Sequence, residues 1–201
     1  MGSSAAKAES YADFHRRSLE DRDAFWTEQA ALRPSARRDE YLTLALSNDG
    51  NTLAVGAYNE DGDLTGTHGN GAYAASGAAY VFARTGTSWA QQSYLKASNA
   101  GAGDFFGIYL SLSGAGDTLA VGAFFERSAL ASDPADDTLA NAGAAYVFQR
   151  NAGAWSQQAY LKAPSPKAQD RFGVSVILSG DGNTLAVGMD GDSSNYTGTF
   201  V

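Results

Sequence analysis

The sequence of 201 residues contains no cysteine. Disulfides, thiolate nucleophiles and cysteine-ligated zinc are therefore excluded. Histidine is scarce as well. Only His15 and His68 occur, in different contexts, so the chain has few residues from which to build a histidine-based catalytic triad or metal cluster. No apolar run approaches the roughly 18 residues that a membrane-spanning helix needs, and the segment 1–30 contains no signal-peptide core.

Basic residues are also in deficit. The chain has 14 Lys and Arg against 22 Asp and Glu, which gives a net charge of -8. A strongly acidic chain repels phosphate backbones, so we expect no nucleic-acid partner. The hydrophobic fraction of 44% is nevertheless sufficient for a packed core. The length predicts one domain with an appendage.

The segment 1–40 differs in composition from the rest of the chain. It contains seven basic and eight acidic side chains, whereas the much longer segment 41–201 contains seven basic and 14 acidic ones. Apolar residues recur at helical spacing, Ser18–Asp21 resembles a capping box, and Pro34 ends the pattern. The sequence therefore predicts a helical leader, with helices over about 8–16 and 20–32, and a linker to about residue 40.

From about residue 41 the chain repeats itself with a constant offset of 66 in the numbering. The clearest copies are SNDGNTLAVGA at 47–57, SGAGDTLAVGA at 113–123 and SGDGNTLAVGM at 179–189. The same offset relates GAAYVF at 77–82 and 143–148, Trp89 and Trp155, YLKA at 94–97 and 160–163, and Phe-Gly at 106–107 and 172–173. A period held by five landmarks indicates duplication, which is typical of propellers, solenoids and arrays.

Each period predicts four β-strands. In the second copy these are about 106–113, 118–124, 143–149 and 154–163, and a Gly/Asp-rich turn separates the first two. The apolar run of the second strand, Leu119–Ala123, predicts burial on both faces. The fold class is therefore all-β, with tandem four-stranded propeller blades. We expect blades over about 41–97, 105–163 and 171–201, the last incomplete, which makes about two and a half copies.

This order of motifs resembles the FG-GAP repeat of integrin α-chain propellers. It is most similar to the bacterial version that contains a W-x-Q-Q-x-Y-L-K-A strand, here Trp89–Ala97 and Trp155–Ala163. The resemblance implies a propeller that serves as a non-enzymatic binding or adhesion scaffold, usually at the cell surface. Because the chain shows no signal peptide, we leave its localisation unassigned.

Two departures from this family pattern affect the expected assembly. The first copy has Glu40-Tyr41 in place of Phe-Gly, and the third copy reaches Val201 about where its third strand would begin. Terminal repeats with uncovered apolar faces are unfavourable. We therefore expect a fragment of a larger propeller, with a homo-oligomer joined through the blade faces as the alternative.

Calcium is the one candidate cofactor. In the family, the turn between the first two strands often carries a calcium loop, but here each such turn has a single carboxylate, which fits a turn-forming role better. A second candidate site is the loop with oxygen donors at Asn59, Asp61 and Asp63. A solvated acidic loop is the favoured explanation of these three residues, because isolated acidic clusters are commoner than ion sites.

The long loops over 58–76 and 124–142 differ from each other more than the strands do. Variable loops on a repeated scaffold commonly carry recognition. Tyr58, Tyr73, Phe124 and Phe125 are therefore candidate contact residues for a protein or glycan ligand. Solvent-exposed connection and packing at strand ends remain the alternatives.

The segment 9–32 resembles the N-terminal helical segment of acetyl- and propionyl-CoA synthetases, because Ser18, Asp21 and Phe25-Trp26 have the spacing of that family. The chain contains no phosphate loop leading to a lysine and no G-x-S-x-G elbow, so we expect no enzyme. An alternative function is an accessory fragment of such a synthetase, with the helix as its docking element. A truncated product without a selected function is a third hypothesis.

Overall fold

The computed structural model describes residues 41–62, 73–129 and 136–191, so the predicted helical leader over 1–40 lies outside the described residues. Within these ranges the chain is all-β. The strands are β1 (Tyr41–Leu46), β2 (Thr52–Ala57), β3 (Ala78–Thr85), β4 (Ser88–Leu95), β5 (Tyr109–Leu112), β6 (Thr118–Ala123), β7 (Ala144–Asn151), β8 (Ala154–Leu161), β9 (Ser175–Leu178) and β10 (Leu185–Gly188). The described part of the chain has no helix that is long and apolar enough to cross a membrane.

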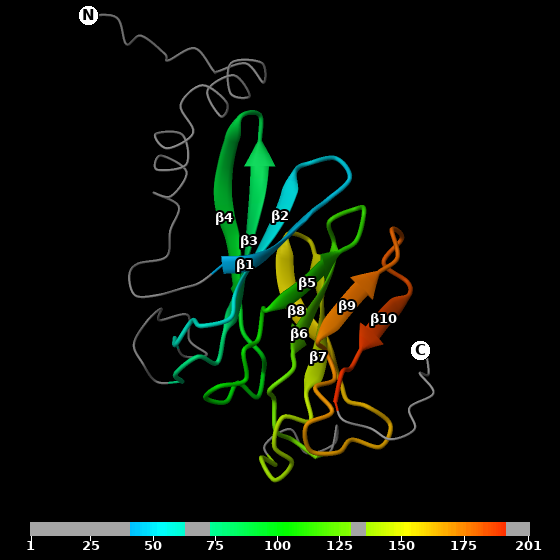
Figure 1. Cartoon of the computed structure of the whole chain (residues 1–201). Coiled ribbons are helices and arrows are strands. Elements are labelled where there is room, and N and C mark those ends of the chain that lie inside the picture. Colours follow the sequence, from blue (N-terminus) through cyan, green and yellow to red (C-terminus); the bar gives the residue numbers. More distant parts are fainter. Residues whose placement is uncertain (1–40, 63–72, 130–135, 192–201) are drawn as a thin grey trace, which may run out of the picture.

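The strands form two antiparallel four-stranded sheets followed by a two-stranded one. The strand order is β1-β2-β3-β4 in blade 1 and β5-β6-β7-β8 in blade 2, and β9-β10 begins blade 3. The three sheets lie side by side in chain order (Figure 1), and the first strands β1, β5 and β9 contact one another in series. The predicted fold class of tandem four-stranded blades is confirmed.

The predicted start of the first strand is wrong in the second repeat. The sequence predicts a strand from residue 106, but β5 begins at Tyr109. Phe106 instead forms a parallel bridge with Gly77 of blade 1, and Phe172 forms the same bridge with Gly143 of blade 2. The Phe-Gly motif therefore joins consecutive blades, because its backbone pairs with the preceding sheet.

Each blade has one face of large side chains and one face of small ones. In blade 2, Tyr146 and Phe148 are 0% and 3% exposed and cluster with Val81 of blade 1. Their counterparts in blade 1, Tyr80 and Phe82, belong to a separate cluster. Because successive side chains point to opposite faces of a strand, these two residues lie on the far side of blade 1. Burial of each large side chain contributes about 1.5–3 kcal/mol.

The small face of blade 2 packs against blade 3. Ala120 and Ala145 are fully buried and cluster with Val176 of β9. The large face of a blade therefore meets the preceding blade, and its small face meets the following one. The predicted burial of Leu119–Ala123 on both faces is confirmed, since β6 is buried along its whole length.

Close approach between consecutive blades requires glycine at one position in the second strand of blade 1 and of blade 2. A methyl group added at Gly56 would lie 1.8 Å from the carbonyl oxygen of Gly107, and one added at Gly122 would lie 2.1 Å from that of Gly173. Both distances are far shorter than a normal non-bonded carbon–oxygen contact. The glycine of the LAVGA motif is therefore set by the contact between blades, not by the conformation of its own strand.

The turn carboxylates act within the turns, as expected for turn-forming residues. Asp49 Oδ1 accepts hydrogen bonds from Ser47 Oγ at 2.6 Å and from Asn51 N at 2.9 Å. These hydrogen bonds, led by the one from Ser47, lower the pKa of Asp49 to about 2. Consecutive turns are also joined to one another, because Gly114 N donates to Gly180 O at 2.8 Å.

Candidate functional site

Five aromatic rings gather where blades 1 and 2 meet. We call this set the aromatic rim: Tyr58, Phe105, Tyr109, Phe124 and Phe125. The centroid of the Phe105 ring lies 5.2 Å from that of Tyr58, 5.1 Å from that of Phe125 and 6.4 Å from that of Phe124. The rings of Phe124 and Phe125 are 4.2 Å apart, and Tyr109 lies 6.4 Å from Phe124. Three of the four predicted contact residues are thus brought into one cluster.

The repeat explains why the rings meet. Tyr58 follows β2 and Phe124 follows β6, so they occupy the same position in consecutive blades, while Phe105 precedes the Phe-Gly bridge between the blades. Phe105 has a φ of 59°, which is unusual for a bulky residue. The bridge holds this conformation, because Phe105 N donates to Ala75 O at 3.2 Å. None of the rim rings is fully buried, and Tyr109 is 37% exposed.

The same scaffold positions carry an ion pair at the next junction. Arg171 and Asp190 are the counterparts of Phe105 and Phe124, and Arg171 Nη1 lies 3.5 Å from Asp190 Oδ1. Arg171 has a φ of 53°, so the backbone conformation is kept although the side chain differs. The same framework therefore carries an aromatic cluster at the first junction and an exposed ion pair at the second.

Next to the rim lies a buried ion pair. Lys162 Nζ is 2.6 Å from Glu126 Oε2, and both side chains are 2% exposed. Glu126 Oε1 also accepts hydrogen bonds from Tyr160 Oη at 2.8 Å and from Asn99 Nδ2 at 3.0 Å. Burial lowers the pKa of Lys162, and the hydrogen bond to Glu126 opposes that change.

Blade 1 contains the matching pair, in which Lys96 Nζ lies 2.9 Å from Glu60 Oε2. Tyr94 Oη donates to the same oxygen at 2.9 Å. Both pairs were missed from the sequence, because the surrounding loop was interpreted as a solvated acidic segment. The signal was present in the repeat: Glu60 and Glu126, like Lys96 and Lys162, are related by the constant offset of the blades. A charge kept in register within an otherwise variable loop indicates a structural partner.

Asp104, beside the aromatic rim, is a buried carboxyl held by a backbone amide. It is 3% exposed, and its Oδ2 accepts a hydrogen bond from Gly101 N at 2.7 Å. Burial raises the pKa of Asp104 to about 7, and the charge of Glu126 adds to this increase. The folded protein therefore favours protonated Asp104, whereas the unfolded chain ionises it near pH 3.8.

The raised pKa of Asp104 predicts a loss of stability with increasing pH. Its contribution is fully present below about pH 4 and disappears as the pH rises through about 7, because the unfolded chain releases the proton first. We expect Asp104→Asn to gain stability relative to the wild-type protein between pH 5 and pH 8, as measured by urea denaturation. Asp170→Asn is the control, since Asp170 Oδ2 also accepts a backbone hydrogen bond. Parallel pH profiles of wild type and Asp104→Asn would contradict this expectation.

The remaining predicted site residues stay apart from the aromatic rim. Tyr73 lies before β3, where its backbone N donates to Asp61 O at 3.5 Å. Asn59 and Asp61 are half-buried, while Asp63 lies outside the described residues. No group of three or more His, Cys, Asp or Glu side chains suited to a metal occurs among the described residues. The calcium site thus stays a prediction.

These features define a protein of tandem four-stranded antiparallel blades, joined by Phe-Gly bridges, of the kind that builds β-propellers. The model of the FG-GAP repeat family matches residues 89–148 and 155–199, more than half of the chain. The chain belongs to the FG-GAP repeat family. The resemblance of the segment 9–32 to acyl-CoA synthetases finds no support in any comparison, and no curated protein matches the chain.

Solved structures with a similar arrangement include three proteins. The β-propeller domain of Myceliophteria thermophila Cps50 (Swd1) is 13% identical, with a TM-score of 0.46 over 77% of this chain and 36% of that one. Pseudomonas aeruginosa periplasmic gluconolactonase, PpgL, is 21% identical, with a TM-score of 0.46 over 79% and 38%. Kuenenia stuttgartiensis hydrazine synthase is 13% identical, with a TM-score of 0.40 over 78% and 46%. The chain therefore spans less than half the length of these structures.

Proposed function

We propose that the protein is a non-enzymatic binding module whose aromatic rim contacts a protein ligand. The observation that carries this proposal is the change of side chains on a constant framework. Phe105 and Phe124 form an aromatic pair at one junction, and Arg171 and Asp190 form an ion pair at the same positions of the next. A scaffold that keeps its backbone while its surface residues change is typical of recognition sites.

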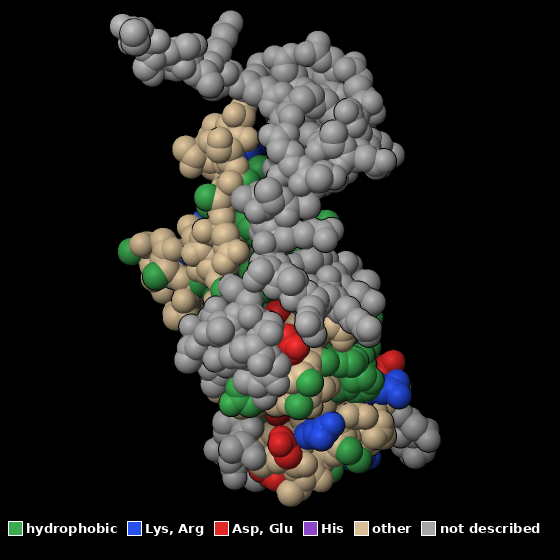
Figure 2. Space-filling view, turned by 90° about the vertical axis from the view of Figure 1, so that its left-hand side faces the viewer, with side chains coloured by type: hydrophobic (Ala, Val, Ile, Leu, Met, Phe, Trp, Pro, Cys, Tyr) green, Lys and Arg blue, Asp and Glu red, His purple; other side chains and the backbone are tan. Residues whose placement is uncertain are grey.

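The geometry of the rings favours a protein ligand over a glycan. Sugar rings stack on a flat, open aromatic face, but the rim rings are tilted by 50–78° to one another. Such a cluster offers ring edges and a shallow apolar surface. Aromatic residues that stay partly accessible, as the rim rings do, are enriched in the central contacts of protein interfaces. On the face shown in Figure 2, hydrophobic side chains form a patch bordered by acidic and basic ones.

The proposal predicts a site-specific contact at Phe125. A photo-reactive phenylalanine analogue at this position is expected to give discrete covalent adducts with a protein in extracts of the source organism. The same analogue at Ala154, an exposed residue at the start of β8, is the control and should give none. The double variant Phe124→Ser/Phe125→Ser should compete for the partner at least about tenfold more weakly than wild type, because both anchoring rings are removed.

Two results would contradict the proposal. Equal adducts at Phe125 and Ala154 would mean that labelling follows exposure alone. Full competition by the double serine variant would mean that the partner binds elsewhere. A glycan array probed with wild type and this variant covers the remaining alternative, since glycan binding that is lost in the variant would assign the rim to a sugar instead. The variants must retain the wild-type unfolding midpoint within a few degrees for any of these results to count.

A further inference from the structure

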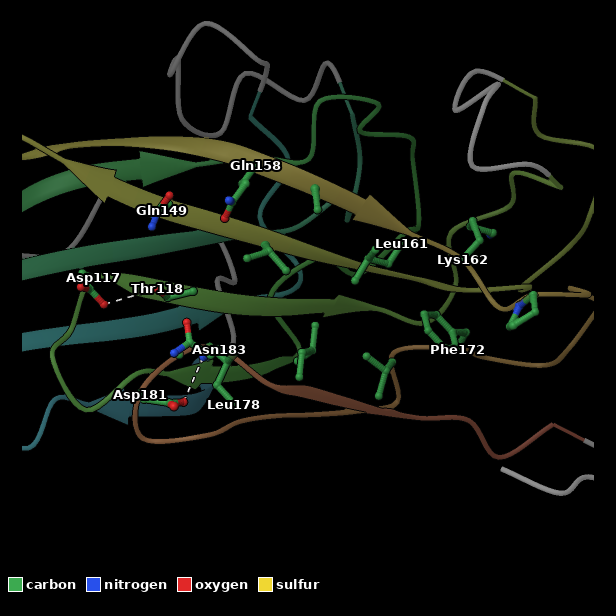
Figure 3. A pocket seen from close by; sticks show the side chains of 16 residues that line it. Asp117, Thr118, Gln149, Gln158, Leu161, Lys162, Phe172, Leu178, Asp181 and Asn183 are labelled. Atoms are coloured by element: carbon green, nitrogen blue, oxygen red, sulfur yellow. Dashed lines mark hydrogen bonds between the residues drawn. The ribbon is translucent and has the colours of Figure 1, made fainter. Parts of the chain in front are cut away.

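The buried ion pair of blade 2 brings an amine and a side-chain amide onto one carboxylate. Lys162 follows the end of β8, next to Leu161 (Figure 3), and its Nζ lies 2.6 Å from Glu126 Oε2. Asn99, from the segment between β4 and β5, donates from Nδ2 to Glu126 Oε1 at 3.0 Å. The two oxygens of one side chain therefore bind both the lysine nitrogen and the amide nitrogen.

The carbonyl oxygen of the same amide is bound by a tyrosine. Tyr146 Oη donates to Asn99 Oδ1 at 2.9 Å, and Tyr146 is fully buried. Burial raises the pKa of Tyr146 well above its ordinary value, so the hydroxyl group stays protonated and remains a donor. A donor in this position stabilises negative charge that develops on the carbonyl oxygen. Asn99 Cγ is therefore the electrophilic atom among these side chains.

Burial also favours the form of Lys162 that can attack this carbon. The side chain is 2% exposed, and burial lowers the pKa of Lys162, although the hydrogen bond to Glu126 opposes this change. Transfer of a proton from the ammonium group to the carboxylate removes two buried charges and leaves a nucleophilic amine. Within the described residues Glu126 is the only hydrogen-bond partner of Lys162 Nζ, so no second acceptor holds the amine after the transfer.

We propose that Lys162 and Asn99 form an intramolecular isopeptide bond in the folded protein. Glu126 takes a proton from the lysine ammonium, and the lone pair of Nζ forms a bond to Asn99 Cγ while the carbonyl π electrons move onto Oδ1, where Tyr146 stabilises them. Glu126 then gives the proton to Nδ2, the Cγ–Nδ2 bond breaks with its electron pair on nitrogen, and ammonia leaves as the carbonyl re-forms. The surplus proton on Nζ returns to Glu126 and leaves with ammonia as ammonium, so the step consumes no oxidant and no water.

Blade 1 contains a similar buried lysine without the amide. Lys96 Nζ lies 2.9 Å from Glu60 Oε2 and donates to Ser76 Oγ at 2.6 Å. A hydroxyl group in this place offers no carbonyl carbon for attack. One repeat after Asn99 the chain has Ser165, so the amide is not repeated in the next blade either. Lys96 is therefore a control for the reaction within the same molecule.

The test begins with the intact mass of the purified full chain. We expect a mass about 17 Da below that of the sequence, because one molecule of ammonia is lost. Trypsin should give a pair of peptides joined through Asn99 and Lys162, should not cleave after Lys162 and should still cleave after Lys96. Since the chain contains no cysteine, faster migration on a denaturing gel would report the same closed loop. The ion pair is the state before the reaction, and the intact mass distinguishes it from the product.

Single substitutions separate the roles of the groups. Lys162→Arg removes the nucleophile, Asn99→Ala removes the electrophile and Glu126→Gln removes the acid–base group, so none of these variants should form the bond. Tyr146→Phe should slow bond formation at least about 100-fold, the effect of losing one oxyanion donor, in a time course that starts with cell-free synthesis. Ser76→Ala is the matched control. It changes a contact of the blade 1 lysine only and should react at the wild-type rate.

Three outcomes would overturn the proposal. The first is a folded wild-type chain that keeps its full mass and is cleaved by trypsin after Lys162. The second is a loss of ammonia that persists in Asn99→Ala, since a succinimide at another asparagine has the same mass but joins no peptides. The third is an equal rate in wild type and Tyr146→Phe, a variant that tests the chemistry even where Glu126→Gln fails to fold. The aromatic rim contributes no atom to the reaction, so failure of the proposed binding function leaves this test unaffected.

Discussion

Replacing Glu126 with leucine is expected to lower the free energy of unfolding by about 3–5 kcal/mol, the usual effect of removing one partner of a buried ion pair. The physical reason is that Lys162, 2% exposed, loses the carboxylate that lies 2.6 Å from its ammonium group. Tyr160 and Asn99 each lose their hydrogen bond to Glu126 at the same time. Since small domains are stable by about 5–15 kcal/mol, the variant would be close to unfolding at room temperature.

Urea denaturation followed by tryptophan fluorescence measures this effect. Asp137→Ala, an exposed acidic residue of the same loop, is the control and should change stability by less than about 0.5 kcal/mol. The double variant Glu126→Leu/Lys162→Met should recover much of the loss, because it removes both charges from the interior. An unfolding free energy for Glu126→Leu within about 1 kcal/mol of wild type would contradict the assignment of a buried, mutually dependent pair.

Gly122→Ala is expected to destabilise the contact between blades 2 and 3 by about 3 kcal/mol, at the upper end of typical overpacking effects. The added methyl group would lie 2.1 Å from Gly173 O, a backbone atom that cannot move away as a flexible side chain does. We expect faster hydrogen exchange in Ser175–Leu178 of β9 than in β6–β8, the strands of the substituted sheet. The loss therefore begins at the junction and not in the sheet that carries the substitution.

The control for this prediction is Gly180→Ala, because a methyl group there meets nothing within 4 Å. Gly56→Ala repeats the experiment at the first junction, where the clash with Gly107 O at 1.8 Å is closer. Unfolding midpoints of Gly122→Ala and Gly180→Ala that agree within error would show that the blades separate enough to admit the methyl group. Such a result would remove the proposed reason for glycine in this motif.

The order and type of the strands could be predicted from the sequence, because the same strand pattern occurs in more than one copy of the repeat. The apolar run Leu119–Ala123 predicted a strand covered on both faces, and β6 has this environment. Phe106 was assigned to the start of a strand, because an aromatic residue beside glycine fits a strand end as well as it fits a bridge between blades. Its bridge to Gly77 depends on a neighbouring sheet, which no local pattern describes.

The candidate site was predictable in part. Phe124 and Phe125 were selected as residues of a variable loop, and they do lie in the aromatic rim. Phe105, which holds the rim together, was not selected, because its φ of 59° and its place between two blades are tertiary properties. Glu126 was missed for a related reason: charge in a loop suggests solvent, and its partner Lys162 lies 36 residues away, just after β8.

The constant spacing of the Phe-Gly bridge has a consequence for the history of the gene. Each junction uses the same two elements, a Gly-Ala segment from one blade and a Phe-Gly segment from the next, and both recur at the same offset along the chain. A crossover between two DNA segments that encode the TLAVGA strand therefore adds or removes one whole blade. Every junction in the recombinant chain would keep the backbone bridge between the Gly-Ala and Phe-Gly segments, so such proteins can gain or lose a whole blade while neighbouring blades stay joined in the same way.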